Sequence, residues 1–326
     1  MFERPRRNRQ NPSIRALVRE NGVLVSDLVW PLFVIEGQNV SEEVPSLPGV
    51  CRLSIDNLVK ECEEAHVLGI QAVLLFPCLS EELKNKKATE SANDKGLLQR
   101  AIAAIKEKIP TLTVMSDVAM DPYSTDGHDG LVSHGEILND ETLPILAAMA
   151  VSQARAGVDI VAPSDMMDGR VAYLRQELDD AGFERVGILS YTAKYASSFY
   201  GPFRDVLDSA PKAGDKKTYQ MDTANIREAL RETRLDIEEG ADIVMVKPGL
   251  PYLDVLKTVS EMVDIPVAVY NVSGEYAMLK LMAEKGLGNY DDLMMEVLLS
   301  FKRAGADMIF TYHAKDAARL LRGSCV

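Results

Sequence analysis

Short apolar runs alternate with longer amphipathic stretches along most of this chain. From residue 28 onward, runs rich in β-branched and aliphatic residues have the length and continuity of buried strands. These predicted strands cover residues 28–35, 70–76, 112–118, 158–162, 186–191, 243–246, 267–271 and 308–312. Apolar residues at helical spacing lie between them, for example over residues 54–68, 94–108, 141–156, 222–239 and 276–284. The alternation predicts a series of strand–helix units.

Strand–helix units in this number favour a closed (β/α)8 TIM barrel over an open sheet. Three of the predicted strands follow the same short phrase, in which a glycine ends a helix just before a buried strand: Ala156-Gly-Val-Asp, Gly240-Ala-Asp and Gly305-Ala-Asp. An open nucleotide-binding sheet needs a G-x-G-x-x-G turn after its first strand, and the sequence has none. A G-x-x-x-x-G-K-[ST] phosphate loop is also missing.

The start of the chain differs in charge from the remainder. Residues 1–20 hold six arginines and two glutamates, whereas the whole chain has a formal net charge of −13. We therefore expect an N-terminal arm over residues 1–27, followed by one barrel over residues 28–326. The apolar spacing of residues 13–20 predicts a helical segment that packs on something, and the acidic surface of a neighbouring subunit is a plausible partner. A disordered tail is the alternative.

Composition narrows the choice of partners and compartment. An acidic chain with a pI near 4.9 is a poor partner for nucleic acid or anionic lipid. No run approaches the ~18 apolar residues of a membrane span, and no apolar stretch follows the basic N-terminus as in a signal peptide. The four cysteines are scattered and have no C-x-x-C spacing, which argues against disulfides and a thiolate zinc site. We expect a cytoplasmic protein.

Two lysines, Lys194 and Lys247, follow neighbouring predicted strands, where barrel enzymes place their active sites. Burial and the mutual repulsion of two ammonium groups both lower a lysine pKa. A neutral lysine amine attacks a carbonyl to form a Schiff base. A surface position or an anion contact is the competing interpretation of each lysine. The residues alone favour a lyase or aldolase that acts on carbonyl compounds.

The segments around the two lysines are long and distinctive. They read Ser190-Tyr-Thr-Ala-Lys-Tyr-Ala-Ser-Ser-Phe-Tyr-Gly-Pro-Phe-Arg204 and Met245-Val-Lys-Pro-Gly-Leu-Pro-Tyr-Leu-Asp254. Further segments of this kind are Arg4-Pro-Arg-Arg, Val29-Trp-Pro-Leu-Phe-Val, Ala162-Pro-Ser-Asp-Met-Met-Asp-Gly-Arg170, Tyr219-Gln-Met-Asp and Tyr270-Asn-Val-Ser-Gly-Glu-Tyr276. Over essentially the whole chain these segments resemble the porphobilinogen synthase family, also called 5-aminolevulinate dehydratase.

The resemblance implies a condensation of two 5-aminolevulinate molecules to porphobilinogen, with loss of two waters, in tetrapyrrole biosynthesis. Each substrate ketone would form a Schiff base with its own lysine: Lys247 on the propionate side and Lys194 on the acetate side. By the same resemblance the protein is a homo-oligomer, expected to be an octamer.

The resemblance also implies how the substrate carboxylates are bound. Arg204 and Lys216 match a basic pair on the acetate side, with Gln220 beside them. Ser273 and Tyr312 match two hydroxyl groups on the propionate side. A carboxylate needs a cation or several fixed donors, so both sets make chemical sense.

Other residues belong to the expected mouth of the barrel. Ser164 lines it by position at a strand end. Asp117 either positions the substrate amine and assists proton transfer or caps a local turn, and the two interpretations are equally supported. Residues 199–220 look too irregular for a strand or helix, and they are long enough for a lid over the substrate.

Metal binding is where the sequence departs most from zinc-dependent members of the family. Those members carry three cysteines in the loop after the third strand, and the matching positions here are Ala119, Asp121 and Asp129. Without thiolates, an active-site zinc is not expected. The two aspartates would bind magnesium or merely form turns. Glu232 matches the glutamate of a stimulatory Mg²⁺ site at a subunit interface, where one carboxylate suffices because Mg²⁺ keeps several waters.

Two rival functions remain. A barrel aldolase of the single-lysine kind would trap substrate on one lysine only, when the Schiff base is reduced. A non-catalytic barrel that binds a ligand or assembles through its arm would trap none.

Overall fold

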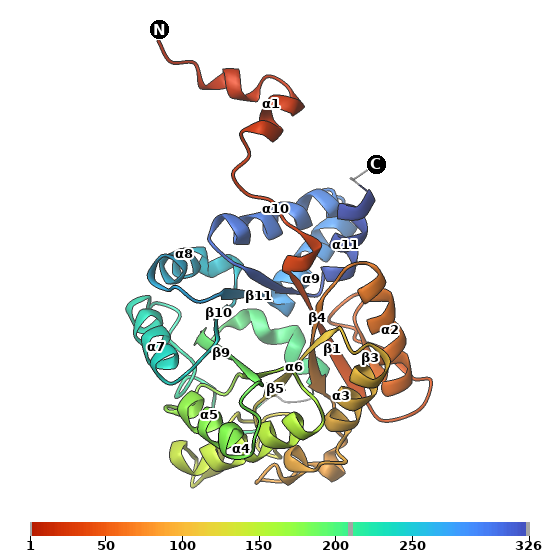
Figure 1. Ribbon diagram of the computed structural model, residues 1–326, viewed down its shortest axis with the longest axis vertical. Coiled ribbons are helices and arrows are strands. Elements are labelled where there is room, and N and C mark those ends of the chain that lie inside the picture. The colour runs from red at the N-terminus through yellow and green to blue at the C-terminus, as the bar shows by residue number, and fades with distance from the viewer. Residues whose placement is uncertain (1, 208–210, 324–326) are drawn as a thin grey trace.

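Eight parallel strands close into a barrel in the computed structural model, which describes residues 2–207 and 211–323 (Figure 1). In order around the barrel they are β1 (Leu28–Ile35), β4 (Ala72–Pro77), β5 (Thr113–Val118), β8 (Ile160–Pro163), β9 (Gly187–Lys194), β10 (Ile243–Lys247), β11 (Val267–Asn271) and β12 (Met308–Thr311). β12 pairs with β1 and closes the ring. The predicted (β/α)8 barrel is confirmed, and the predicted bounds of β1 and β11 match the observed ones.

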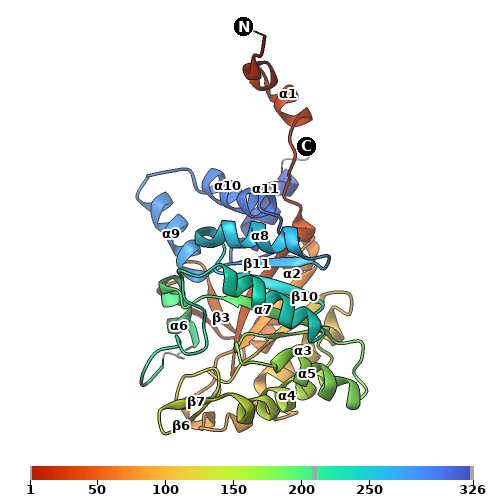
Figure 2. The same cartoon turned by 90° about the vertical axis from the view of Figure 1, so that its left-hand side faces the viewer.

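Helices surround the ring of strands (Figures 1 and 2). They are α2 (Ile55–Val67), α3 (Leu97–Lys108), α4 (Asn139–Arg155), α5 (Arg170–Asp180), α7 (Arg227–Glu238), α8 (Leu253–Met262), α9 (Ser273–Glu284), α10 (Tyr290–Arg303) and α11 (Ala314–Gly323). The five helical stretches named from the sequence are all present as helices, with ends that differ by at most five residues.

Short strands and 3₁₀ turns are added to the barrel. β3 (Cys51–Ser54) pairs with β1, and β2 (Ser41–Glu43) extends the sheet beyond it, while β6 (Leu131–Ser133) and β7 (Glu136–Leu138) form a separate hairpin. The 3₁₀ turns are η1 (Pro5–Arg9), η2 (Val25–Asp27), η3 (Glu81–Leu83), η4 (Thr89–Ala92), η5 (Ser198–Tyr200) and η6 (Leu250–Tyr252).

Strand residues alternate between two hydrophobic clusters. In β4, Val73 and Leu75 belong to the cluster between strands and helices, whereas Leu74 and Phe76 belong to the cluster inside the barrel. This alternation follows from the two-residue period of a strand. The interior of the barrel is therefore filled with side chains, and its chemistry is confined to the ends of the strands.

One irregularity in β9 changes which way its last side chain points. Leu189 and Tyr191 belong to the interior cluster, but Ala193 belongs to the outer one. The pairing with β10 shifts at the same place, because Val244 faces Ser190 and Val246 faces Ala193. β9 thus carries one extra residue, a β-bulge. Strict alternation would aim Lys194 outward, and the bulge turns it to the interior.

A short helix, α6 (Gly201–Leu207), lies across the centre of the ring in Figure 1. The expectation that residues 199–220 form neither strand nor helix is wrong for this part. Pro202 is the second residue of the helix, where a missing N–H costs nothing, so it does not prevent the helix from starting. Residues 208–210, which belong to the same predicted lid, lie outside the described residues.

The N-terminal arm projects away from the barrel (Figures 1 and 2). It contains η1 and α1 (Pro12–Leu17), neither of which has a buried residue. The helical spacing predicted for residues 13–20 is thus present as a helix over part of that range. Within the described ranges, no helix combines the length and apolar character needed to cross a membrane. Cys51, Cys62 and Cys78 are free thiols, and Cys325 lies outside the described residues.

Candidate active site

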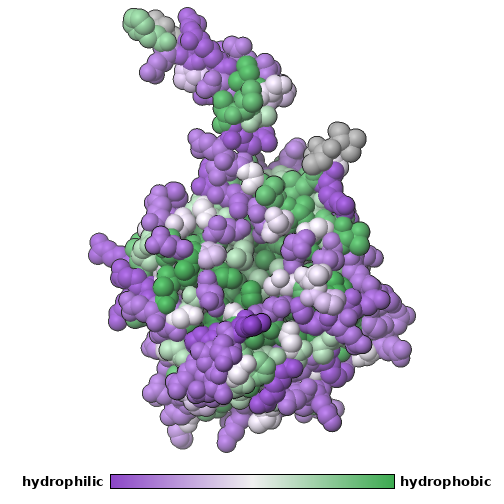
Figure 3. Space-filling view, viewed as in Figure 1, coloured by the Kyte–Doolittle hydropathy of each residue, from purple (hydrophilic) through white to green (hydrophobic). Residues whose placement is uncertain are grey.

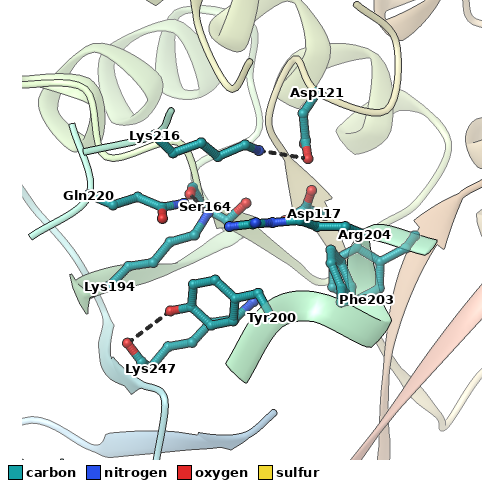
Figure 4. Close-up of a pocket in the computed structure, with 11 residues that line it drawn as sticks. Asp117, Asp121, Ser164, Lys194, Tyr200, Phe203, Arg204, Lys216, Gln220 and Lys247 are labelled. Carbon is teal, nitrogen blue, oxygen red and sulfur yellow. Dashed lines mark hydrogen bonds and ion pairs between the residues drawn. The ribbon is translucent and has the colours of Figure 1, made fainter. Parts of the chain in front are cut away.

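A small cavity opens at the carboxyl ends of the strands, under α6 (Figure 4). Seven of the predicted site residues line it: Asp117, Ser164, Lys194, Arg204, Lys216, Gln220 and Lys247. Asp121, Tyr200, Phe203 and Phe76 complete the lining. The volume is about 30 Å³, enough for a water or two. A ligand of several heavy atoms enters only when lining side chains move, and Phe203 and Arg204 of α6 are the ones that cover the strand ends.

Lys194 and Lys247 are the last residues of β9 and β10, and they are register partners across the two strands. Lys247 lies among aromatic rings, with its Nζ 4.3 Å from the centre of Tyr270 and 4.9 Å from that of Tyr191. In the described part of the chain, no side chain or carbonyl makes a hydrogen bond or ion pair with this Nζ. Burial, and next the positive charge of Lys194, lower the pKa of Lys247 to about 7. A large share of this amine is neutral at physiological pH.

Lys194 has a polar environment instead. Its Nζ donates to the backbone oxygen of Ser164 and lies 3.2 Å from Asp129 Oδ2. Asp129 also accepts from Lys216 at 2.6 Å, and Lys216 reaches Asp121 at 3.1 Å. Burial acts to raise the pKa of Asp129, but Lys194 and Lys216 outweigh it and lower that pKa to about 2. The carboxylate of Asp129 thus stays charged between two lysines.

Asp117 faces this group of charges from the end of β5 (Figure 4). Burial, followed by the negative charge of Asp121, raises the pKa of Asp117 to about 7. Its Oδ1 is buried and has no hydrogen-bond partner among the described residues. A carboxyl group that is half protonated near neutral pH and has a free oxygen can donate or accept a proton, which favours the proton-transfer interpretation over the turn cap.

The loop that follows β5 holds the segment that carries Lys216 and Gln220. The Nε2 of His128 donates to the carbonyl oxygen of Ala213 at 2.9 Å, so its Nδ1 accepts from the Tyr219 hydroxyl at 3.1 Å. The backbone N–H of Asp129 donates to the same hydroxyl at 3.3 Å. These contacts fasten residues 213–220 over the cavity.

Ser273 and Tyr312 do not line this cavity. The Ser273 hydroxyl accepts a hydrogen bond from the backbone N–H of Phe203 at 3.0 Å. The first turn of α6 therefore already binds this hydroxyl. The ring of Tyr312 stacks on Phe33 with centroids 6.1 Å apart, and Phe33 in turn contacts Phe203 at 5.8 Å. Ser273 thus contacts α6 directly, whereas Tyr312 is linked to Phe203 only through Phe33 and lines a separate cavity.

Aromatic side chains of α6 and η5 were not among the predicted site residues. Phe203 and Tyr200 each lie within 5.4 Å of the Lys247 amine, measured to their ring centres. The Tyr200 hydroxyl also donates to the backbone oxygen of Lys247 at 3.2 Å. The sequence did carry a signal, since both residues stand in the distinctive segment that follows Lys194.

The two possible metal positions differ. Ala119 offers no ligand atom, and the carboxylates of Asp121 and Asp129 are already paired with lysines, so these three positions do not fit a metal. Within residues 2–207 and 211–323, no three or more His, Cys, Asp or Glu side chains cluster as a metal site. Glu232 is half-buried and lies outside the barrel mouth, in a cavity of about 150 Å³ that Asp168, Glu228 and Asn139 also line. Burial and the neighbouring carboxylates raise the pKa of Glu232, so this cavity has excess negative charge that a hydrated cation would offset.

Two buried lysines in register at the mouth of a closed barrel define an enzyme of the (β/α)8 class, with its active site at the carboxyl ends of the strands. The profile of the family described as Delta-aminolevulinic acid dehydratase matches residues 2–320. The chain belongs to this family, and its activity is the condensation of 5-aminolevulinate to porphobilinogen.

Individual relatives agree along the whole length. A Delta-aminolevulinic acid dehydratase from Bradyrhizobium diazoefficiens is 53% identical over 320 residues, which cover 98% of this chain and 91% of the relative. One from Synechococcus elongatus is 50% identical, and 98% of each chain is covered. The crystal structure of the Toxoplasma gondii enzyme, in complex with the reaction product porphobilinogen, is 54% identical with a TM-score of 0.97, and covers 98% of this chain and 92% of that one.

Proposed function

We propose that Lys194 and Lys247 carry the condensation by each forming a Schiff base with one 5-aminolevulinate molecule. The observation that carries this proposal is the register pairing of the two lysines at the end of β9 and β10, with both amines in one cavity. In each step the neutral amine adds to the substrate ketone and one water leaves, which gives an imine. Two such sites side by side hold two ketones within reach of each other.

We further infer that Lys247 reacts first. Its pKa of about 7 leaves a large neutral fraction, and no carboxylate of the described residues pairs with it. The amine of Lys194 is bound by Asp129 and by the Ser164 carbonyl, and it has to be released before it attacks. Asp117, with a pKa of about 7 and an unpartnered oxygen, is suited to move the protons that imine formation requires.

The substrate carboxylates are expected to bind on two sides of the cavity. On the Lys194 side, Arg204 and Lys216 supply the positive charge, and a carboxylate there would replace the Asp121 and Asp129 oxygens on Lys216. On the Lys247 side, the hydroxyls of Ser273 and Tyr312 are the expected donors, and that of Ser273 becomes available when Phe203 moves away. Gln220 has a buried oxygen without a partner among the described residues, so it can accept a hydrogen bond from the substrate.

We propose that Mg²⁺ binds beside Glu232 and stimulates the enzyme, with no zinc in the active site. Asp168 and Glu228 line the same cavity and would bind the waters of the ion. Thr218, Tyr219 and Met221 line it too, so a cation there would steady the segment that carries Lys216 and Gln220. When bound, the ion supplies charge that offsets the acidic cluster.

We also propose that the arm, residues 1–27, makes contacts in a homo-oligomer, expected to be an octamer, and that the protein is cytoplasmic. The arm stands clear of its own barrel and carries hydrophobic patches among hydrophilic ones (Figure 3). Phe2 is fully exposed and Leu17 is 84% exposed, and the same segment holds six arginines. An acidic barrel offers such an arm a complementary surface on a second copy.

Reduction with borohydride in the presence of 5-aminolevulinate tests the Schiff-base proposal. Adducts on both Lys194 and Lys247 support it. An adduct on one lysine alone would favour a single-lysine aldolase chemistry, and no adduct would favour a barrel that only binds its ligand.

A further inference from the structure

A chain of hydrogen bonds runs beneath the mouth of the barrel and joins three strand ends. The backbone N–H groups of Gly249 and Leu250 both donate to Glu275 Oε1 at 3.0 Å. The amide of Asn271 donates to Glu275 Oε2 at 2.6 Å. The Thr311 hydroxyl donates to the other end of the Asn271 amide at 2.9 Å.

Every bond in this chain has a fixed direction. In its ionised form Glu275 can only accept hydrogen bonds, so the Asn271 amide then presents its NH₂ group to Glu275 and its oxygen to Thr311. The Thr311 oxygen in turn accepts from the backbone N–H of His313 at 3.1 Å. Glu275 is 1% exposed, and Asn271 and Thr311 are 0% exposed, so water does not replace any of these partners.

The residues joined in this way stand next to those assigned to one substrate molecule. Gly249 follows Lys247 by two positions, Asn271 precedes Ser273 by two, and Thr311 directly precedes Tyr312. Lys247, Ser273 and Tyr312 are the lysine and the two hydroxyl-bearing residues proposed for the propionate side. None of the residues proposed for the Lys194 side belongs to this network.

The position of the Lys247 amine depends on the lysine's backbone more than the position of the Lys194 amine does. Side-chain and carbonyl oxygens hold the amine of Lys194 directly, whereas the amine of Lys247 lies over aromatic rings and has no hydrogen-bond partner among the described residues. Rings attract a cation but do not fix a neutral amine at one point. The position of the Lys247 amine therefore depends on how the backbone around the lysine is held. Tyr195 N–H and the Tyr200 hydroxyl hold the carbonyl oxygen of Lys247, and Glu275 holds the turn that follows the lysine.

We propose that Glu275, through Asn271 and Thr311, is a positioning residue that keeps Lys247 aligned with Ser273 and Tyr312 for the first 5-aminolevulinate molecule. This inference rests on the proposed Schiff base at Lys247. A buried carboxyl group is costly, and burial raises the pKa of Glu275 to about 7, in spite of the hydrogen bonds that it accepts. A side chain that served only to fill this space would not need to be an acid.

The direction of the bonds allows a rescue experiment. Glu275→Gln turns an NH₂ group toward the NH₂ group of Asn271, and Asn271→Asp turns a carboxylate toward that of Glu275. In the double variant Glu275→Gln/Asn271→Asp, the new amide donates to the new carboxylate, which still accepts from Thr311. The double variant thus restores the chain of bonds with the charge moved to the other side chain.

The measurement is the yield of reduced 5-aminolevulinate adduct on Lys247 relative to Lys194 in the same sample, by mass spectrometry of peptides. Each single variant should lower this ratio on the order of tenfold, because small misplacement of a reacting group has a large effect. The double variant should restore it to within about threefold of wild type, on the same argument. A ratio unchanged in the single variants, or not restored in the double one, would overturn the inference.

Two further variants keep the test decisive if a single variant fails to fold. Thr311→Val removes one hydroxyl from the chain and should lower the ratio in the same direction. Thr192→Val is the matched control, since Thr192 is a buried threonine on β9 outside the network, and it should leave the ratio unchanged. Equal losses on both lysines would indicate general damage and would also overturn the inference. Absence of any Lys247 adduct in the wild type would instead refute the proposed function.

Discussion

Lys194 and Lys247 are paired in register at the ends of adjacent parallel strands, yet their surroundings are opposite. Lys194 is held by Asp129 and a backbone carbonyl, and Lys247 is enclosed by aromatic rings. One lysine is thus kept in a polar contact while the other has a pKa near neutrality. This asymmetry suits an enzyme that must treat two identical substrate molecules differently.

The pKa of Lys247 gives a prediction about pH. Because its folded pKa is lowered to about 7, the neutral amine predominates above that pH and the ammonium below it. The rate at which acetic anhydride labels Lys247 should therefore rise through a midpoint near pH 7 and then level off. Lys194→Met removes a neighbouring positive charge, so it should move the midpoint upward, on the order of 0.5–1 pH unit. Lys257→Met, on the exposed face of α8, is the control and should not move it. A wild-type midpoint near 10 would contradict the assignment.

A second prediction concerns Asp129, which is 1% exposed and bridges Lys194 and Lys216. Asp129→Asn leaves two buried cations without a shared anion, so the free energy of unfolding should fall by about 3–5 kcal/mol. Asp121→Asn should cost less, since Lys216 keeps Asp129. Urea denaturation of the two variants measures the difference. Equal losses of free energy of unfolding in the two variants would show that Asp129 stabilises the fold no more than Asp121 does.

A third prediction concerns Mg²⁺. In metal-free buffer, added Mg²⁺ should raise both the initial rate and the Tm of the wild type. Glu232→Gln should abolish both responses, whereas Glu238→Gln, an exposed position on the same helix, should retain them. A chelator selective for thiolate-bound zinc should leave activity intact. If Glu232→Gln still responds like the wild type, the cation binds elsewhere.

A fourth prediction concerns the arm. Deletion of residues 1–12 should lower the oligomer mass and the activity together, because it removes Phe2 and most of the arm's basic side chains. Light scattering measures the mass directly. An unchanged mass would show that the arm does not hold the subunits together.

The sequence was sufficient for the barrel because its strands are continuous apolar runs, as buried parallel strands require. It was also sufficient for the cavity-lining lysines, because those stand in distinctive segments at strand ends. It could not predict the bulge in β9, since nothing in residues 190–194 marks the extra residue that turns Lys194 inward. A bulge depends on pairing with the neighbouring strand.

The sequence also could not predict the pairing of Asp129 with two lysines. Asp129 stands in a loop, and Lys194 and Lys216 follow it by 65 and 87 residues, so only the folded chain brings them together. The helix α6 was missed because glycine and proline dominate its start, and a short helix gains most of its stability from packing. The position of Phe203 over the cavity follows from the same packing, since its ring contacts Phe33 and Phe76.

The central claim is that two lysines of one chain each form a Schiff base with 5-aminolevulinate. The most direct test is borohydride reduction of the wild-type enzyme during turnover, followed by mass spectrometry of the peptides that contain Lys194 and Lys247. We predict an adduct on both peptides, an adduct only at Lys247 in Lys194→Ala, and no porphobilinogen from either Lys194→Ala or Lys247→Ala. Substantial turnover by either variant, or a wild-type enzyme trapped on one lysine alone, would contradict the account.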